Sequence, residues 1–223
     1  RKTYIWAELA VSSIMKVVIS GYGRMGHMIE KVLLEKGYED IIATEDVCAT
    51  DPSLASQSVC IDFTFPESFR ANYKFLADNF KAVVVGTTGW ADIKDQVIEY
   101  FQKKGTPMIY ASNYSIGVNA LFAAVKKASE IMKDQGYTPS IEEIHHIHKM
   151  DAPSGTAKRL GTLVTDSMGQ EPEITSIREG EVPGIHTVEF LSSVDKLVFS
   201  HEAFSREGFA RGAVYAAQIA DNL

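Results

Sequence analysis

Cysteine is scarce in this chain of 223 residues, which contains only Cys48 and Cys60. They form no CxxC pair, so neither a disulfide framework nor a thiolate metal site is expected, and a reducing, cytoplasmic location fits best. No apolar run reaches the roughly 18 residues that a membrane-spanning helix needs. The chain has 22 basic against 29 acidic residues, and its formal net charge of -7 argues against general binding to nucleic acid or to an acidic membrane.

The residues that are present suffice for a globular protein. Hydrophobic residues make up 45% of the chain and aromatic residues 10%, enough to bury a core in one domain or in two small ones. Residues 1–14 stand apart, because their basic start and short mixed middle precede the first regular pattern. We interpret them as a leader or an artificial addition.

From Met15 onward the pattern predicts a strand, a glycine turn, a helix and a second strand. KVVIS (16–20) is a short apolar run, GYGRMG (21–26) follows it, and apolar residues then recur at helical spacing until Gly37. DIIATE (40–45) predicts a strand that closes on Glu45. Together these segments make a βαβ unit of about 30 residues.

This unit favours dinucleotide binding. Gly21 allows a tight turn, Gly23 lets backbone amides approach a pyrophosphate, and Gly26 permits close contact between helix and strand. Glu45 lies at a suitable distance along the chain to accept a hydrogen bond from a ribose hydroxyl. The alternative is a tight turn in which the glycines serve geometry alone. The candidate cofactor residues of this unit are Gly21, Gly23, Arg24, Met25, Gly26 and Glu45.

Three further β-branched or apolar runs predict strands, VCIDFT (59–64), AVVVG (82–86) and MIYAS (108–112). In a parallel sheet, the turns that follow such strands lie at the carboxyl edge, where ligands bind. The turn residues are therefore candidates for cofactor contact, although each turn could be an ordinary connection. They are Gly86, Thr87, Thr88, Ser112, Asn113 and Tyr114.

The pattern of predicted secondary structure changes after Ser112. Residues 115–134 predict one long helix, and SIEEIHHIHK (140–149) predicts a strand with Glu143, His145 and Lys149 on one side. A helix follows, capped by Ser154 or Thr156, and further strands are expected after about residue 175. The predicted fold is α/β, with a Rossmann-type doubly wound nucleotide domain and an α+β substrate domain built on a mixed or antiparallel sheet.

The segment HHIHKMDAPSGTA (145–157) has the highest density of side chains that can bind or transfer protons. A zinc site is disfavoured, because Lys149 adds positive charge and no carboxylate or thiol is expected at ligand spacing. Some of the histidines, His148 above all, could have a purely structural role. The third hypothesis for this segment is an anion site. In it, Lys149 and histidines face the free amides of a helix N-terminus and hold one or two carboxylates. In an unbroken strand His145 and Lys149 would lie roughly 13 Å apart, so this reading requires a bend after Ile147.

The sequence resembles the dihydrodipicolinate reductase family of the lysine and diaminopimelate pathway, from Met15 to about Ala217. HHIHKMDAPSGTA is close to the signature of that family, and GYGRMG, DFTFPES (62–68), VVVGTTG (83–89), ASNYSIGVN (111–119) and SREGFARGAVYAA (205–217) match further segments in order. Two departures are a short segment between Asp46 and Val59 and the lack of a tail after IADNL.

The resemblance implies a site and a reaction. His145 would be the general acid, assisted by Lys149, which also binds substrate. His146 would line the pocket, and Ser154, Gly155 and Thr156 would hold a substrate carboxylate. The implied reaction is the reduction of 4-hydroxy-tetrahydrodipicolinate (dihydrodipicolinate), a small dicarboxylate, to tetrahydrodipicolinate by a reduced nicotinamide, with no metal.

The resemblance also implies a homotetramer and a domain division, with 15–112 and 206–223 binding the dinucleotide and 113–205 binding substrate and forming the oligomer. NADH is expected to be preferred over NADPH, because Glu45 and Asp46 would repel a 2′-phosphate, while Arg24 could soften that preference. Two other classes of function stay open: a catalytically silent nicotinamide sensor and a metal-dependent hydrolase that uses the histidines.

Overall fold

The computed structural model describes residues 15–223, so the interpretation of residues 1–14 lies outside the described part of the chain. Contacts between residues divide the chain into two units, with the divisions after Tyr110 and after Gly212. The predicted divisions followed residues 112 and 205, and the binding roles assigned to the two parts stay a prediction. Among the described residues, no helix is both long and apolar enough to cross a membrane.

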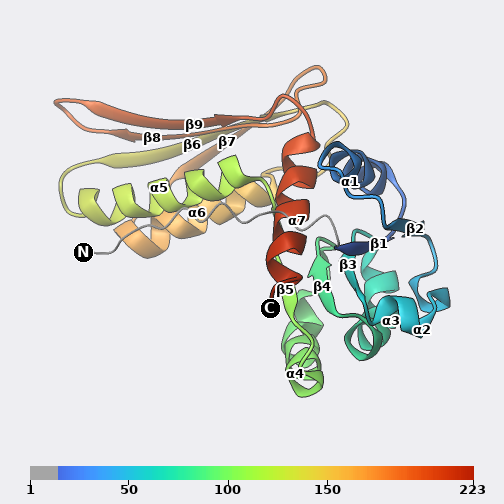
Figure 1. Cartoon of the computed structure of the whole chain (residues 1–223). Helices are drawn as coiled ribbons and strands as arrows, with labels where there is room; N and C mark the ends of the chain where they lie inside the picture. The colour runs from blue at the N-terminus through green and yellow to red at the C-terminus, as the bar shows by residue number, and fades with distance from the viewer. Residues whose placement is uncertain (1–14) are drawn as a thin grey trace, which may run out of the picture. The chain divides into compact units, whose positions relative to one another are not determined.

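The first unit is built on a five-stranded parallel sheet with the order β2-β1-β3-β4-β5 (Figure 1). The buried strands are rich in valine and isoleucine, as expected for parallel strands covered on both faces. Strand order reverses between β1 and β3, so their carboxyl ends form the switch point at which such sheets bind ligands. The strands are β1 Lys16–Ser20, β2 Ile41–Thr44, β3 Ser58–Asp62, β4 Ala82–Val85 and β5 Met108–Tyr110.

Helices cover this sheet. Helix α1 (Arg24–Glu35) begins directly after the glycine turn and buries Ile29, Val32 and Leu33. Its C-cap residue is Lys36, which is followed by Gly37 with a positive φ of 82°. Helices α3 (Pro66–Asn79) and α4 (Lys94–Lys104) bury an aromatic cluster against the sheet. Short segments η1 Val47–Ala49, α2 Pro52–Ala55 and η2 Ala91–Ile93 complete the connections.

The second unit contains a four-stranded mixed sheet with the order β7-β6-β8-β9. Strand β6 (Thr138–His145) pairs in parallel with β7 (Glu173–Arg178) and antiparallel with β8 (Ile185–Leu191), which pairs antiparallel with β9 (Lys196–Glu202). Helices α5 (Ile116–Met132) and α6 (Gly155–Met168) pack together and against this sheet, where they bury one apolar core (Figure 1). The predicted fold class, a Rossmann-like parallel sheet with a second mixed sheet, is confirmed.

Helix α7 (Glu207–Ala220) crosses the second division. Before the division, a Cβ atom on Gly212 would overlap the carbonyl oxygen of Tyr114, so the close approach of these two backbones requires glycine. After the division, Gln218 donates a hydrogen bond to the Tyr38 hydroxyl (2.9 Å), and Lys81 pairs with Asp221 (2.7 Å). The end of the chain is therefore anchored in the first unit.

One predicted element is too long. The strand expected over 140–149 ends at His145, and the amide of Lys149 donates to the carbonyl of His146 (3.1 Å) in a turn. The alternation of Ile141, Glu143 and His145 on the buried side is correct, but Lys149 does not continue that side. The prediction fails here because the backbone turns after His145, where the amide of His146 donates to the carbonyl of Val182 (2.8 Å).

Candidate functional site

The first unit has a pocket of about 460 Å³ at the carboxyl ends of its strands. The glycine turn after β1, the end of β2, the turn after β3 and the turn after β4 all contribute to its wall. Eight of the residues predicted to contact a cofactor line it: Gly21, Gly23, Arg24, Met25, Glu45, Gly86, Thr87 and Thr88. Phe63, Thr64, Phe65 and Ser68 complete the lining and were not predicted.

The glycine turn has the geometry of a phosphate cradle. Gly21 has a positive φ of 87°, and a Cβ atom on Gly26 would overlap the carbonyl oxygen of Gly21. A Cβ atom on Gly23 would meet nothing within 4 Å, so the space above this backbone is open at the start of α1. Open amides and a helix N-terminus are what a pyrophosphate requires, and the residues therefore fit a dinucleotide.

The acidic residues at the end of β2 have different roles. Glu45 lines the pocket, and its Oε1 accepts a hydrogen bond from the Tyr22 amide (2.9 Å), which ties it to the glycine turn. The Asp46 carboxylate accepts from the Cys48 amide (3.1 Å) and caps η1. Glu45 therefore lines the pocket wall, whereas the Asp46 carboxylate is used to cap η1.

A buried carboxylate joins the strand ends beneath the pocket. Asp62, which is fully buried, accepts hydrogen bonds from Ser20 (2.8 Å), Thr64 (3.1 Å) and Thr87 (2.5 Å). Burial raises the pKa of Asp62, and these hydroxyl donors oppose the shift. The Thr87 hydroxyl also accepts from the Thr64 amide (2.7 Å), so both of its hydrogen-bonding functions are used inside the protein. The Thr87 carbonyl accepts from Trp90 Nε1 (2.6 Å), so the side chain and the carbonyl of Thr87 both have partners inside the protein.

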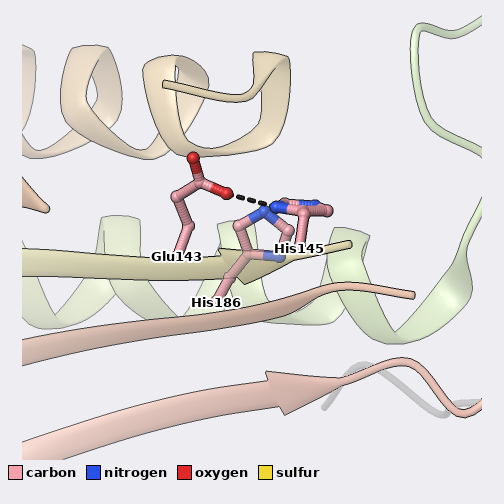
Figure 2. Close-up of side chains that lie close together, drawn as sticks. All are labelled: Glu143, His145 and His186. Carbon is pink, nitrogen blue, oxygen red and sulfur yellow. Dashed lines mark hydrogen bonds and ion pairs between the residues drawn. The ribbon is translucent and has the colours of Figure 1, made fainter. Parts of the chain in front are cut away.

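The second unit places His145 at the end of β6, beside a carboxylate. Glu143 and His145 are two residues apart on the buried side of the strand, and Glu143 Oε2 contacts His145 Nδ1 (Figure 2). Burial lowers the pKa of His145, Glu143 opposes that shift, and Lys149 and Arg178 reinforce it. His145 is therefore expected to be neutral at pH 7, with Nδ1 donating its hydrogen to Glu143.

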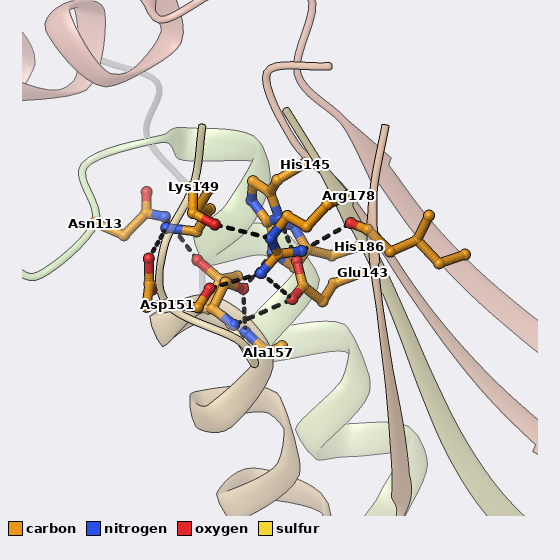
Figure 3. A network of polar contacts seen from close by, with 11 residues as sticks. Asn113, Glu143, His145, Lys149, Asp151, Ala157, Arg178 and His186 are labelled. Atoms are coloured by element: carbon orange, nitrogen blue, oxygen red, sulfur yellow. Dashed lines mark hydrogen bonds and ion pairs between the residues drawn. The ribbon is translucent and has the colours of Figure 1, made fainter. Parts of the chain in front are cut away.

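Arg178 connects this pair to the turn that carries Lys149 (Figure 3). Its Nη2 donates to Glu143 Oε1 (2.9 Å) and to the carbonyl of Asp151 (2.6 Å), and its Nε donates to the carbonyl of Lys149 (3.2 Å). Lys149 Nζ in turn donates to Asp151 Oδ1 (2.7 Å). The bend therefore makes Lys149 and His145 parts of one network, which an unbroken strand would not allow.

The N-terminus of α6 lies in the same network. Ser154 caps the helix by accepting from the Ala157 amide (3.2 Å), and its hydroxyl contacts His186 Nε2 (3.1 Å). The Ser154 amide was expected to be free for a ligand, but it donates to Glu143 Oε1 (3.2 Å). Within residues 15–223, the amides of Gly155 and Thr156 have no hydrogen-bond acceptor, so these two remain for an anion.

The other predicted residues lie around this centre or outside it. Asn113 donates to the Thr156 hydroxyl (3.4 Å) and accepts from the Ser115 amide (2.9 Å), while Tyr114 is buried and Ser112 is exposed. These three belong to the second unit.

The remaining two histidines of the dense stretch lie side by side after β6. His146 is partly buried, and the rings of His146 and His148 lie 5.9 Å apart. The His148 side chain is 65% exposed and pairs with Glu181 (2.8 Å), so it has a surface partner rather than a place in the core.

A carboxylate does lie near the histidines, contrary to the expectation from the sequence. Ligand atoms of Glu143, His145 and His186 lie within 4.8 Å of one another. A metal ion there would compete with the Arg178 guanidinium, which already holds Glu143, and would lie close to Lys149. The charge of the site therefore favours an anion over a cation.

Sequence reasoning missed Glu143, Arg178 and His186 as parts of this centre. The strand alternation placed Glu143 on the same side as His145, and this signal could have identified it. No local pattern in the sequence indicated Arg178 or His186, because the pairing of strands brings them to the centre. Arg178 on β7 lies opposite His145 on β6, and His186 on β8 lies opposite Glu143 on β6.

Two protein-family models match the chain. The model described as "Dihydrodipicolinate reductase, N-terminus" matches residues 40–114, and the model described as "Dihydrodipicolinate reductase, C-terminus" matches residues 117–222. The second match contains the whole of the centre around His145. Together the two matches span well over half of the chain.

Curated relatives and a solved structure agree with these matches. A 4-hydroxy-tetrahydrodipicolinate reductase of Christiangramia forsetii is 38% identical and covers 92% of this chain and 91% of its own. One of Chromohalobacter salexigens is 32% identical and covers 90% and 75%. The structure titled "Dipicolinate bound Dihydrodipicolinate reductase from Paenisporosarcina sp. TG-14" shares the fold, with a TM-score of 0.78 at 18% identity over 94% of this chain and 96% of that one. The chain belongs to the dihydrodipicolinate reductase family, whose members are oxidoreductases that use a pyridine nucleotide.

Proposed function

We propose that this protein reduces 4-hydroxy-tetrahydrodipicolinate to tetrahydrodipicolinate with a reduced nicotinamide, in lysine and diaminopimelate biosynthesis. The observation that carries the proposal is the network around His145, in which a lysine and two open helix amides share one site with a buried imidazole. Relatives with the name of this activity match most of the chain, and the first unit supplies a dinucleotide pocket.

The reaction takes one hydride from the reduced nicotinamide and one proton, and it releases water from the hydroxylated substrate. The proton is the part of this chemistry that the chain itself must supply. His145 is proposed as the donor, since it is held in a fixed orientation by Glu143 and its other ring nitrogen is not engaged by that contact. Lys149 is proposed to assist it through its positive charge, which also attracts a dicarboxylate.

The substrate carboxylates are proposed to bind at two places. The amides of Gly155 and Thr156, at the positive end of the α6 dipole, suit one carboxylate. Lys149 suits the other, provided that it exchanges its contact with Asp151 for the substrate. His146 is proposed to line the same pocket, with the hydroxyl of Thr156 close to the first carboxylate.

NADH is proposed as the preferred cofactor, with some use of NADPH. Glu45 lies in the pocket and would accept from a free 2′-hydroxyl, whereas a 2′-phosphate would meet its negative charge. Asp46 adds to that charge even though its side chain caps η1. Arg24 is exposed on the same pocket wall and can offset part of the repulsion.

Self-association as a homotetramer is proposed from the second unit. Helices α5 and α6 pack against the sheet, yet large apolar side chains on the hairpin of β8 and β9 remain exposed, and two of them, Leu191 and Val198, lie on the same face. A face of this kind is stabilised by a partner. Leu191 is 50% exposed and Val198 43%, and Val194 in the turn of the hairpin is 86% exposed, whereas Leu197 (37%) lies on the opposite face with the buried Phe190. A cytoplasmic location is proposed as well, since Cys48 and Cys60 are free thiols.

The proposed function is tested by following nicotinamide oxidation with freshly prepared 4-hydroxy-tetrahydrodipicolinate. Lys149→Ala and His145→Ala should each lower kcat/KM by about 100- to 10,000-fold, the range for loss of general acid catalysis, while the affinity for NADH changes little. Lys126→Ala, an exposed lysine on α5, is the matched control and should keep full turnover. Near-normal turnover in both site variants, or no turnover by the wild type, would contradict the proposal. Inhibition by a chelator at fixed cofactor would favour a metal-dependent hydrolase instead.

A further inference from the structure

Glu143 occupies the centre of the network although the proposed reaction gives it no contact with substrate. It is fully buried, and it contacts His145 with Oε2 while Oε1 receives Arg178 (2.9 Å) and the Ser154 amide (3.2 Å). A buried carboxylate with partners on three different elements would be costly unless each partner were satisfied. Its position therefore calls for an explanation beyond packing.

We propose that Glu143 is a positioning residue that keeps the hydrogen of the neutral His145 ring on Nδ1 and supports the proton that Nε2 delivers to the substrate. This inference rests on the proposed function for the proton transfer, but not for the geometry of the pair. A carboxylate accepts hydrogen bonds and donates none, so the nitrogen that faces it must carry the hydrogen. The other nitrogen, Nε2, is left to take up a proton and pass it on.

Glu143 keeps its negative charge in spite of burial. Burial is the largest single influence and by itself would raise the pKa of Glu143. The hydrogen bonds that the carboxylate receives, the one from Arg178 foremost, act together with the charge of His145 to outweigh burial, so that the pKa falls to about 2. The carboxylate is therefore ionised throughout the neutral range. Arg178 lies directly across from His145 in the register of β6 and β7, and its guanidinium reaches Glu143, two residues before His145 on β6.

The charges around His145 give Glu143 a second effect. On the loop, Lys149 disfavours a protonated ring, as does Arg178 from β7, and the ring of His186 from β8 lies 4.9 Å away, centroid to centroid. Glu143, on β6 itself, is the negative charge that opposes them. A general acid must hold its proton before it gives it up, so removing this charge should leave fewer His145 rings in the protonated form.

Gly184 leaves space beside Nε2 of His145 because it has no side chain. A Cβ atom on Gly184 would lie 3.0 Å from His145 Nε2 and 3.2 Å from its Cδ2, and Gly184 has a positive φ of 154°. A larger residue would therefore crowd the nitrogen that is left for the proton. The Glu143 contact on one side of the ring and the glycine on the other point to the same assignment of the two nitrogens.

The first test uses the wild type and does not depend on turnover. Nitrogen-15 chemical shifts of the imidazole rings, assigned to His145 by comparison with His145→Ala, report which ring nitrogen carries the hydrogen at neutral pH. The hydrogen is expected on Nδ1. A ring that carries it on Nε2 would overturn the inference, even if the protein is a fully active reductase.

The second test compares Glu143→Gln with Glu142→Gln, which makes the same change one residue earlier on the exposed side of β6. Glu143→Gln should lower kcat by about 100-fold or more, as for loss of general acid catalysis, and should move the limb of the pH profile that reports the acid to lower pH. Glu142→Gln should leave both unchanged. Binding of NADH and of dipicolinate, each measured by calorimetry, shows whether the Glu143→Gln site is still formed.

The outcomes separate the two proposals. A Glu143→Gln variant that binds both ligands but keeps the wild-type pH limb would overturn the positioning role. If that variant does not fold, the nitrogen-15 assignment in the wild type still decides the question. A wild type that shows the expected ring hydrogen but no reductase activity would contradict the proposed function alone.

Discussion

His186 is expected to make this protein sensitive to mild acid. The residue is 5% exposed, and its Nε2 contacts the Ser154 hydroxyl (3.1 Å), while its Nδ1 is buried without a hydrogen-bond partner. Burial lowers the pKa of His186 to about 4, and the neighbouring His145, His201 and Lys149 add to the shift, which Glu143 opposes. A positive charge on this ring would therefore be poorly solvated in the folded state.

The sign of the effect follows from proton binding. Between about pH 4 and pH 6.5 the unfolded chain binds a proton at His186 that the folded chain does not, so the free energy of unfolding rises with pH across this window. The contribution is fully present above the unfolded pKa and is lost as the pH falls toward 4. Between about pH 7 and pH 5, a shift of this size corresponds to a loss of about 2 kcal/mol.

Urea unfolding at fixed protein concentration measures this loss, with the wild type and His186→Gln each examined at about pH 7 and pH 5. The absolute stability of the variant is not the readout, because the substitution also changes packing. The variant should lose about 2 kcal/mol less than the wild type between the two pH values. The lowered pKa of Glu143 does not interfere, since its contribution is present above about pH 4.5 and is lost only as the pH falls through about 2. Equal losses in the two proteins, or an NMR titration of His186 near pH 6.5, would refute the reasoning.

Two further predictions concern the cofactor and the oligomer. The ratio of kcat/KM for NADH to that for NADPH should exceed one at low ionic strength, where the repulsion from Glu45 is least screened, and Arg24→Ala should increase it; a clear preference for NADPH would show that cations outweigh the carboxylates. The mass in solution at micromolar concentration should be that of a tetramer. Leu191→Glu and Val198→Glu, which place charges on the exposed apolar face of β8 and β9, should lower that mass, whereas a monomeric wild type would contradict the proposed interface.

Local patterns in the sequence were sufficient for the first unit. The glycine turn, α1 and the end of β2 follow from short-range rules, because a tight βα turn needs glycine and a parallel strand needs continuous apolar residues. Since the carboxyl ends of parallel strands meet at one edge, Gly21, Glu45 and Gly86 were expected in the same pocket, and they line it. The family, too, could be inferred from the order of its segments.

Other details depended on hydrogen bonds that no pattern reveals. The Asp46 carboxylate caps η1, and the Thr87 hydroxyl is used by Asp62 and by the Thr64 amide. The end of β6 was placed too late along the chain, because alternation continues through the letters of HHIHK although the backbone turns after His145. A periodic pattern shows which side a residue would face in a strand, but not where tertiary contacts end that strand.

The sequence by itself determined which groups are the candidates for the chemistry, because the residue types of His145, Lys149 and the Ser-Gly-Thr turn limit what they can bind or transfer. Only the tertiary structure decided how they act together. Arg178 and His186 come to the centre through the register of β7 and β8 against β6, over separations in the chain that local rules do not span. The register of a sheet is set by the burial of whole strands, so the carboxylate that orients His145 and the guanidinium that fixes this carboxylate are known only once the strands are paired.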